Sequence, residues 1–313
     1  MRSCIRSRIA LILVSGSLLL SREALSQDDQ RAYMRTFDST VVASSNYTVD
    51  YFRLYSPSMQ REIKVLVATP HSYADNPEGI FPILYTLHGA RSPYDTWHHL
   101  LRLQDNIKDK PFIYTCFDGD AVSNYIDSYY PIRTSRDRDD TTTQISLFQT
   151  FFFDEFMPAI DAWYRVDDSK RAITGYSMGG QGALNYMLVE PDRFTAISAL
   201  STTVLDFRDR SSFSYKMMSR YLGDIDAYPE RYEALDEFVR IEKYKENNVE
   251  LPPVYLHCGT EDRLLGMSRK LDKFLKDLGY EVRFVETQGG HNWDFWLKAA
   301  SGVIDFHWNY FNE

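Results

Sequence analysis

A single serine stands between two glycines in the run Gly175-Tyr176-Ser177-Met178-Gly179, which matches the pattern G-x-S-x-G. A short apolar segment (171–174) precedes this run, and a stretch rich in small residues follows it. A sharp turn from a strand into a helix would expose the Ser177 hydroxyl near the positive end of that helix. The motif therefore predicts a nucleophilic serine, which needs a general base within hydrogen-bond reach.

Three histidines follow Ser177 in the sequence and could supply that base. His291 comes after the last predicted strand and directly after two glycines, so we expect a tight loop that can carry its imidazole over the serine. His257 lies inside a predicted strand, and His307 lies in an aromatic terminal helix. We therefore favour His291 as the base.

A carboxylate must orient the imidazole, and it is expected between the serine and the histidine in the chain. Asp262 is favoured because it follows a predicted strand and a turn, where a short side chain can bond one imidazole nitrogen. Glu261 is the first alternative and Asp206 the second. Asp294 is too close to His291 in sequence to face it easily.

Attack by a serine on a carbonyl also requires two amide donors for the developing oxyanion. One is the amide of Met178, the residue after the nucleophile. The other is expected in the loop after the apolar run that ends at His88-Gly89, where Ala90 or Arg91 is placed to donate. Both residues remain candidates for the second donor.

These residues need a scaffold, and the alternation of apolar runs with helix-like stretches predicts one. Strands separated by helices indicate a mostly parallel sheet covered on both faces, with the site at the carboxyl ends of its strands. Helices are expected at 149–164, 181–188 and 267–278. The segment 204–253 is polar, aromatic and partly helical, and we interpret it as an insertion near the edge that carries the site. Strands are expected at 63–68, 82–87, 112–117, 171–174, 194–200, 254–258 and 282–286.

The first 26 residues have the pattern of an export signal, with three early arginines, an apolar stretch from Ile9 to Leu20 and small residues at positions 24 and 26 of the run Ala24-Leu25-Ser26. We expect the remainder, 27–313, to form one domain that is secreted or periplasmic. Cleavage would remove four arginines and one glutamate and would take the formal charge from −9 to −12. Such a charge disfavours nucleic acids and anionic membranes as partners.

The remaining composition limits the chemistry further. No histidine and cysteine cluster has metal-ligand spacing, so we predict no metal, and nucleophilic catalysis by a serine requires no cofactor. Cys116 and Cys258 lie in predicted core strands, and we expect two free thiols. Aromatic residues make up 15% of the chain, which favours a site that stacks on rings or sugars, although a well-filled core would give the same count. Candidate substrate contacts are His88, Arg91, Trp97, Tyr125 and Trp293.

Together these motifs resemble the esterase D family of α/β-hydrolases. That family includes feruloyl and acetylxylan esterases, S-formylglutathione hydrolases, siderophore esterases and the antigen 85 mycolyltransferases. The resemblance extends from Tyr51 to Trp308 and is strongest in five runs. They are Ser56 to Val65, Leu87-His88-Gly89, Gly175 to Gly180, Cys258 to Asp262 and Gly290 to Trp296.

The resemblance implies an α/β-hydrolase fold and a secreted serine carboxylesterase that acts through Ser177, His291 and Asp262, with Ala90 and Met178 as oxyanion donors. Antigen 85 has an aspartate where His88 stands and a glutamate as its acid, so this chain is more similar to the hydrolytic members. Acetyl or feruloyl esters on carbohydrate are the expected substrates. The alternatives are acyl transfer to a sugar, hydrolysis of a siderophore or thioester, and carbohydrate binding without catalysis.

Overall fold

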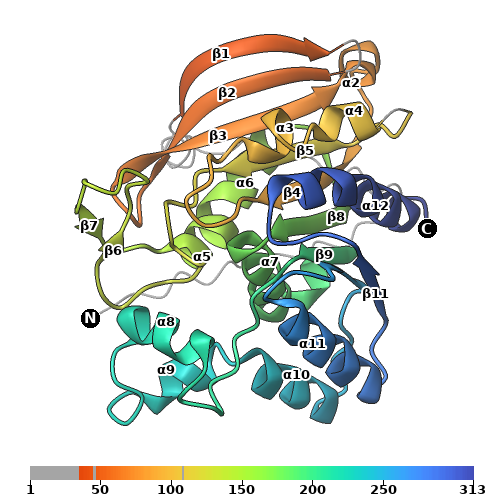
Figure 1. The fold of residues 1–313 in the computed structure, drawn as a ribbon. Helices are drawn as coiled ribbons and strands as arrows, with labels where there is room; N and C mark the ends of the chain where they lie inside the picture. The colour runs from red at the N-terminus through yellow and green to blue at the C-terminus, as the bar shows by residue number, and fades with distance from the viewer. Residues whose placement is uncertain (1–34, 45–46, 108) are drawn as a thin grey trace, which may run out of the picture.

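A computed structural model describes residues 35–44, 47–107 and 109–313, and it contains a nine-stranded mixed sheet (Figure 1). The strand order is β1-β2-β3-β5-β4-β8-β9-β10-β11. The first three strands run antiparallel to their neighbours, and the six from β5 to β11 are parallel to one another. The strands are β1 (Arg35–Ser44), β2 (Tyr47–Ser56), β3 (Arg61–Pro70), β4 (Phe81–Leu87), β5 (Ile113–Phe117), β8 (Val166–Tyr176), β9 (Ala196–Leu200), β10 (Val254–Gly259) and β11 (Val282–Thr287).

The predicted parallel sheet is confirmed, and each of the seven expected strands overlaps an observed one. The two strands before them, β1 and β2, were not predicted. In β2, Val49 packs into the core on one face of the sheet, whereas Leu54 packs into the core on the other face. The buried positions therefore change phase within the strand, and no single period-2 pattern marks it.

Helices cover both faces of the sheet. One face carries α12 (Trp293–Phe311) with the short helices α3 (Thr96–His99) and α4 (Leu103–Ile107), which share one buried cluster. The opposite face carries α7 (Met178–Val189) and α11 (Leu265–Asp277). The predicted helix at 149–164 is also on this face, and it is built of α5 (Phe148–Thr150), a π-helical stretch (Phe151–Phe156) and α6 (Met157–Trp163).

The segment 204–253 connects β9 to β10 and contains three helices. The last of them, α10 (Glu237–Glu246), packs into the main core through Phe238 and Ile241. The first two, α8 (Phe213–Leu222) and α9 (Pro229–Glu233), form a separate small core with Ile126 and Ile132. Figure 1 shows α8 and α9 at the end of the molecule opposite β1. The segment is thus a partly independent insertion, as expected from its composition.

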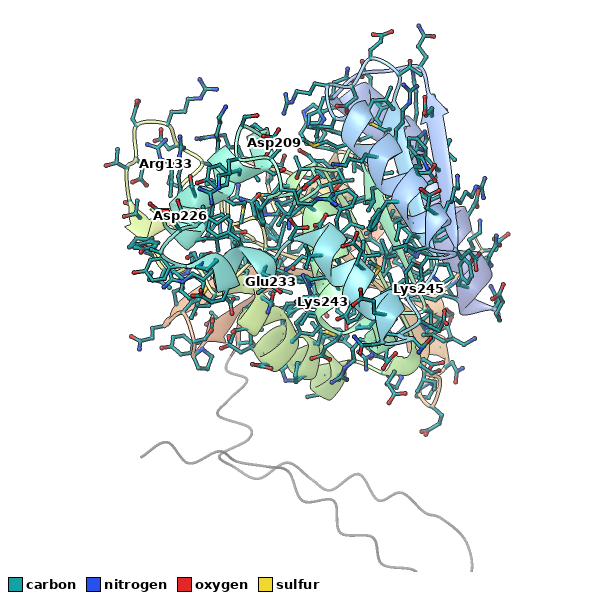
Figure 2. The ribbon with its side chains drawn as sticks, turned by 90° about the horizontal axis from the view of Figure 1, so that it is seen from below. Arg133, Asp209, Asp226, Glu233, Lys243 and Lys245 are labelled. Carbon is teal, nitrogen blue, oxygen red and sulfur yellow. The ribbon has the colours of Figure 1, made fainter. Side chains whose placement is uncertain are left out.

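Charged side chains cover the outer surface of this insertion, as Figure 2 shows for Asp226, Glu233 and Lys243. Lys243 pairs with Glu233, and Arg210 pairs with Asp226 at 2.6 Å. Opposite charges on exposed side chains contribute little to stability individually. The short strands β6 (Ile132–Arg133) and β7 (Thr143–Gln144) form a separate two-stranded sheet beside it.

Two further predictions concern the N-terminal segment and the two cysteines. The expected export signal, residues 1–26, lies outside the described residues. Cys116 and Cys258 are both buried and free. Within the described ranges, no helix has both the length and the apolar character that crossing a bilayer requires.

Candidate active site

Ser177 occupies the turn between β8 and α7, with φ 55° and ψ −119°. A non-glycine residue rarely adopts this backbone conformation, and such outliers gather at functional sites. Gly179 makes the turn possible, because a Cβ at that position would lie 2.3 Å from the carbonyl oxygen of Leu87. The absence of a side chain there lets α7 begin directly against β4, and the Ser177 side chain reaches a surface pocket.

The imidazole of His291 lies beside this serine. His291 follows β11 in the loop before α12, and its Nε2 is 2.9 Å from Ser177 Oγ. The loop is held close to the turn after β10, because the Glu261 amide donates to the Gly289 carbonyl at 2.9 Å. Trp296 packs against the imidazole in an edge arrangement with ring centroids 4.9 Å apart. These contacts hold the ring in one orientation.

The carboxylate of Asp262 contacts the other nitrogen of the His291 imidazole. Its Oδ2 is 2.9 Å from His291 Nδ1, and its Oδ1 accepts a hydrogen bond from the Leu264 amide at 2.9 Å. The Asp262 side chain is fully buried. Burial alone would raise the pKa of this carboxyl, but the hydrogen bonds from His291 and the Leu264 amide outweigh it and lower the pKa below its usual value. The carboxylate is therefore ionised near neutral pH.

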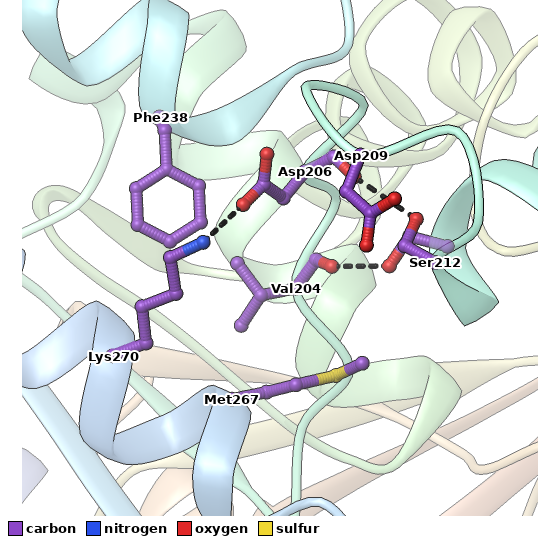
Figure 3. A pocket seen from close by; sticks show the side chains of 8 residues that line it. Val204, Asp206, Asp209, Ser212, Phe238, Met267 and Lys270 are labelled. Carbon is purple, nitrogen blue, oxygen red and sulfur yellow. Dashed lines mark hydrogen bonds and ion pairs between the residues drawn. The ribbon is translucent and has the colours of Figure 1, made fainter.

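The alternative acids and bases lie elsewhere. Figure 3 shows Asp206 directed toward Lys270, with which it forms an ion pair, at the edge of a separate cavity. His257 is hydrogen-bonded to Tyr255 and Thr287, and His307 to Ser198. Glu261 and Asp294 are exposed. Among the described residues, Asp262 alone has its carboxylate on the imidazole of His291.

Two amides are placed beside the serine. Met178 is the first residue of α7, where a backbone N–H has no helical carbonyl to bond. Ala90 is exposed and lines the same pocket as Ser177. The amide of Arg91, by contrast, donates to the Ala121 carbonyl at 2.7 Å. Of the two residues considered for the second donor, Ala90 is the one whose amide is not used by the fold in the described part of the chain.

His88 does not line the pocket, and instead supports the loop that carries Ala90. Its Nε2 accepts from the Gly119 amide at 2.9 Å, so the proton resides on Nδ1, which donates to the Gly89 carbonyl at 2.8 Å. Burial, together with Arg136, lowers the pKa of His88 to about 4 and keeps it neutral. The Gly89 carbonyl and the Ala90 N–H belong to one planar peptide, so fixing the carbonyl fixes the direction of the N–H.

An ion pair braces the next part of the loop. Arg136 binds Asp118 through both carboxylate oxygens, at 2.6 and 3.1 Å. The same guanidinium donates from Nε to the Ser92 carbonyl at 2.7 Å. Asp118 follows β5 and Ser92 follows β4, so Arg136 joins the segments after two adjacent strands, next to the loop that carries Ala90. No motif in the sequence marks either charged residue as a support for this loop.

The substrate contacts expected at His88, Trp97 and Tyr125 are wrong. All three side chains are fully buried. The Trp97 indole donates to the Leu87 carbonyl at 2.9 Å, and the Tyr125 hydroxyl donates to the His88 carbonyl at 3.1 Å. Their rings fill the core under the loop, which is the other explanation for the high aromatic content.

A cavity of about 350 Å³ surrounds Ser177 and His291. Trp293, an expected contact, does line it and is 40% exposed, whereas Arg91 is exposed but outside the lining. Arg263 and Asn292 line it as well; neither was predicted from the sequence, although they directly follow Asp262 and His291. No residue of the 204–253 insertion contributes. The lining consists of Gly89, Ala90, Ser92, Tyr176, Ser177, Arg263, His291, Asn292, Trp293 and Trp296.

The described ranges contain no group of three or more His, Cys, Asp or Glu side chains placed to hold a metal ion. At this pocket a hydroxyl, an imidazole and a buried carboxylate behind it form one hydrogen-bonded series, with Ala90 in the pocket lining and Met178 directly after the serine. This arrangement is suited to acyl transfer through a serine.

Comparison with known proteins is consistent with this geometry. The chain is 34% identical over 146 residues to an acetyl esterase from Caldicellulosiruptor saccharolyticus, an alignment that covers 44% of this chain and 54% of that protein. The chain spans about half the length of the curated relatives it matches.

Solved structures share the fold. A ferulic acid esterase superposes with a TM-score of 0.64 at 24% identity, covering 85% of this chain and 99% of that one. An S-formylglutathione hydrolase from Agrobacterium tumefaciens gives a TM-score of 0.71 at 16% identity, covering 87% and 98%. The model of the family described as "Putative esterase" matches residues 56–302. The chain therefore belongs to this esterase family and has its α/β-hydrolase fold.

Proposed function

We propose that this protein hydrolyses carboxylic esters, with Ser177 as the nucleophile. The observation that carries the proposal is the position of one imidazole. His291 is 2.9 Å from the Ser177 hydroxyl on one side and 2.9 Å from the Asp262 carboxylate on the other. A serine hydroxyl is a weak nucleophile until such a base removes its proton. Membership of an esterase family supports the same reaction class.

In the first half of the reaction, Ser177 Oγ forms a bond to the ester carbonyl carbon while its proton passes to His291 Nε2. The carbonyl oxygen becomes negatively charged and is stabilised by the amides of Ala90 and Met178. Collapse of this intermediate breaks the bond to the alcohol oxygen, which takes the proton from His291. Asp262 stays ionised throughout and stabilises the imidazolium, as its lowered pKa favours.

The second half releases the acid. A water molecule gives its proton to His291 Nε2 and attacks the carbonyl carbon of the acyl-enzyme. The bond to Ser177 Oγ then breaks, and the serine regains its proton. The whole cycle uses side chains and amides of this chain.

We further propose esters of carbohydrates or phenols as the natural substrates. Trp293 supports this class, because its indole is 40% exposed at the pocket rim and presents a flat apolar surface to a ring. The names of the related acetyl esterase and of the ferulic acid esterase agree with a small or aromatic acyl group. Product analysis distinguishes hydrolysis from acyl transfer, since a sugar acceptor would yield an acylated sugar instead of free acid.

We propose that the protein acts outside the cytoplasm, as the signal-like pattern at 1–26 indicates. The intact mass of the exported protein tests this point. Removal of about 26 residues is expected, and a full-length protein retained in the cytoplasm would contradict it.

The proposed activity is tested with Ser177→Ala on p-nitrophenyl acetate. We expect kcat to fall by roughly three or more orders of magnitude, because the nucleophile is lost while the amide donors remain. Ser219→Ala, at an outward position on α8, is the matched control and should retain full activity. Wild-type turnover by Ser177→Ala would overturn the proposal.

A further inference from the structure

Arg263 is the one permanently charged residue in the lining of the Ser177 pocket. It directly follows Asp262, in the turn between β10 and α11, and its side chain is exposed. The other lining residues are glycine, alanine, serine, aromatic residues, asparagine and histidine. No aspartate or glutamate lines the pocket in the described part of the chain. The pocket of the proposed nucleophile thus includes one arginine and, among the described residues, no acidic residue in its lining.

Several cations near the pocket form ion pairs within the fold, whereas Arg263 forms none with the described residues. Arg269 on α11 binds Glu286 at 2.6 Å, and Lys270 pairs with Asp206. Behind the oxyanion loop, Arg136 binds Asp118. Among the described residues, Arg263 has no carboxylate within ion-pair distance and no hydrogen-bond acceptor.

The adjacent acids do not neutralise Arg263. Both oxygens of Asp262 are engaged, one by His291 and one by the Leu264 amide. Glu261 is exposed and makes no ion pair among the described side chains. Arg263 therefore keeps its full donor set for a ligand in the pocket.

The charge of the whole chain makes this position unusual. The sequence carries a formal charge of −9, so the protein repels anions at long range. A guanidinium in a pocket reverses this locally, and its planar donors match the two oxygens of a carboxylate, phosphate or sulfate. The aromatic walls formed by Tyr176, Trp293 and Trp296 lower the exposure of such a pair to water.

We propose that Arg263 selects esters that carry an anionic group close to the reacting carbonyl. This inference rests on the proposed ester hydrolysis and adds a substrate class to it: a ring or short apolar part for the indoles and a negative charge for the guanidinium. The anionic group can belong to the alcohol or to the acyl part. Arg263 is a specificity residue in this account and takes no part in proton transfer.

Two pairs of substrates test the proposal and separate the two sources of charge. For the alcohol part, 4-acetoxybenzoate is compared with its neutral methyl ester. For the acyl part, mono-4-nitrophenyl succinate is compared with 4-nitrophenyl methyl succinate, and release of 4-nitrophenolate is followed. For each substrate, kcat/KM of the variant is divided by kcat/KM of the wild type. This ratio does not depend on the intrinsic reactivity of the ester, so the anionic and neutral members of a pair can be compared directly.

In Arg263→Gln, kcat/KM for the anionic member of at least one pair should fall roughly tenfold, as expected when a charge-assisted hydrogen bond is lost. The neutral member should change by less than about twofold, because it never used that bond. Arg263→Lys should recover part of the loss, since it restores the charge without the planar fork. Arg220→Gln removes the same charge from an exposed position on α8, and it should leave kcat/KM for all four substrates at the wild-type value.

Equal effects on the anionic and neutral members of both pairs, or no effect at all, would overturn the role of Arg263. That result would leave the proposed hydrolysis intact as long as Ser177→Ala is inactive. Wild-type activity of Ser177→Ala would instead contradict the proposed function itself. Thermal melting of Arg263→Gln checks that the exposed substitution has not unfolded the protein.

Discussion

At Ser177 the backbone adopts a conformation that few non-glycine residues take, and the side chain is thereby presented to His291. The two residues are 114 positions apart in the sequence, and Asp262 lies 29 positions before the histidine. Each follows the carboxyl end of a parallel strand, which explains how residues so distant in the chain come within hydrogen-bond reach.

The buried carboxylate gives a prediction at the same scale. In Asp262→Asn the amide cannot hold the proton of His291 on Nδ1 with the same strength, so the imidazole can present the wrong tautomer to the serine. We expect kcat to fall by roughly three to four orders of magnitude. Steady-state kinetics measure it, with the adjacent Glu261→Gln as the control. Equal activity of the two variants would show that Asp262 does not orient the base.

Arg136 should act on the reaction without touching substrate. Arg136→Met removes the hydrogen bond to the Ser92 carbonyl and leaves Asp118 without its partner, so the oxyanion loop loses a support. We expect kcat to fall by roughly tenfold or more with little change in KM, because oxyanion donors act mainly in the transition state. Arg133→Met, three residues earlier and also partly buried, is the control. A change confined to KM would indicate substrate binding instead.

At the scale of elements, close approach of α7 to β4 builds the turn that holds Ser177. Gly179→Ala would place a Cβ 2.3 Å from the Leu87 carbonyl oxygen, and backbone atoms on both sides must move to accept it. Gly266, in the first turn of α11, is the matched position because a Cβ there meets nothing within 4 Å.

We therefore expect opposite effects on the free energy of unfolding. Gly179→Ala should lose several kcal/mol, on the order of the larger overpacking penalties. Gly266→Ala should gain up to about 1 kcal/mol from the better helix propensity of alanine. Urea denaturation of both variants measures the difference. Similar stabilities for the two would contradict the close packing of α7 on β4.

Parts of this element structure could be read from the sequence, and the reasons differ from part to part. The run 254–258 is apolar apart from His257 and is bounded by turns, and a strand buried on both faces leaves that pattern in the sequence. Strand β2 was missed because its buried side changes between Val49 and Leu54. The Arg136–Asp118 pair joins two loops that no local pattern relates.

The amino-acid composition did not distinguish aromatic residues of the core from those that line the pocket. Trp97 and Tyr125 were expected at the pocket, yet both are fully buried, because a large ring with one polar atom is equally suited to either place. Arg263 was not considered although it follows Asp262 directly. Its exposure and its lack of a partner depend on where distant side chains lie, and these are properties of the tertiary structure.

For the whole molecule, four histidines make stability depend on pH. Burial lowers the pKa of His98 and His257 to about 4 and that of His307 to about 3, and burial with Arg136 lowers that of His88 to about 4. An unfolded histidine titrates near pH 6.5, so below that pH the unfolded chain binds more protons than the folded one. The free energy of unfolding should therefore decrease as the pH falls from about 6.5 to 4.

His307 isolates this effect, because it is fully buried and hydrogen-bonded only to Ser198 among the described residues. Burial raises the pKa of the Glu237 carboxyl, so this residue makes the free energy of unfolding increase as the pH falls, opposite to the histidines. In His307→Gln the slope of unfolding free energy against pH should decrease by up to about 1.4 kcal/mol per pH unit between pH 6 and 4. Denaturant titrations at several pH values measure it, and an unchanged slope would contradict a neutral buried imidazole.

The central claim is that an acyl group becomes bound to Ser177 during turnover. The most direct measurement is mass spectrometry of protein quenched in acid during reaction with p-nitrophenyl acetate, followed by peptide mapping. We expect an acetyl group of about 42 Da on the peptide that contains Ser177, and none in Ser177→Ala. Rapid turnover with the acyl group on a different residue, or turnover that persists unchanged in Ser177→Ala, would contradict the account.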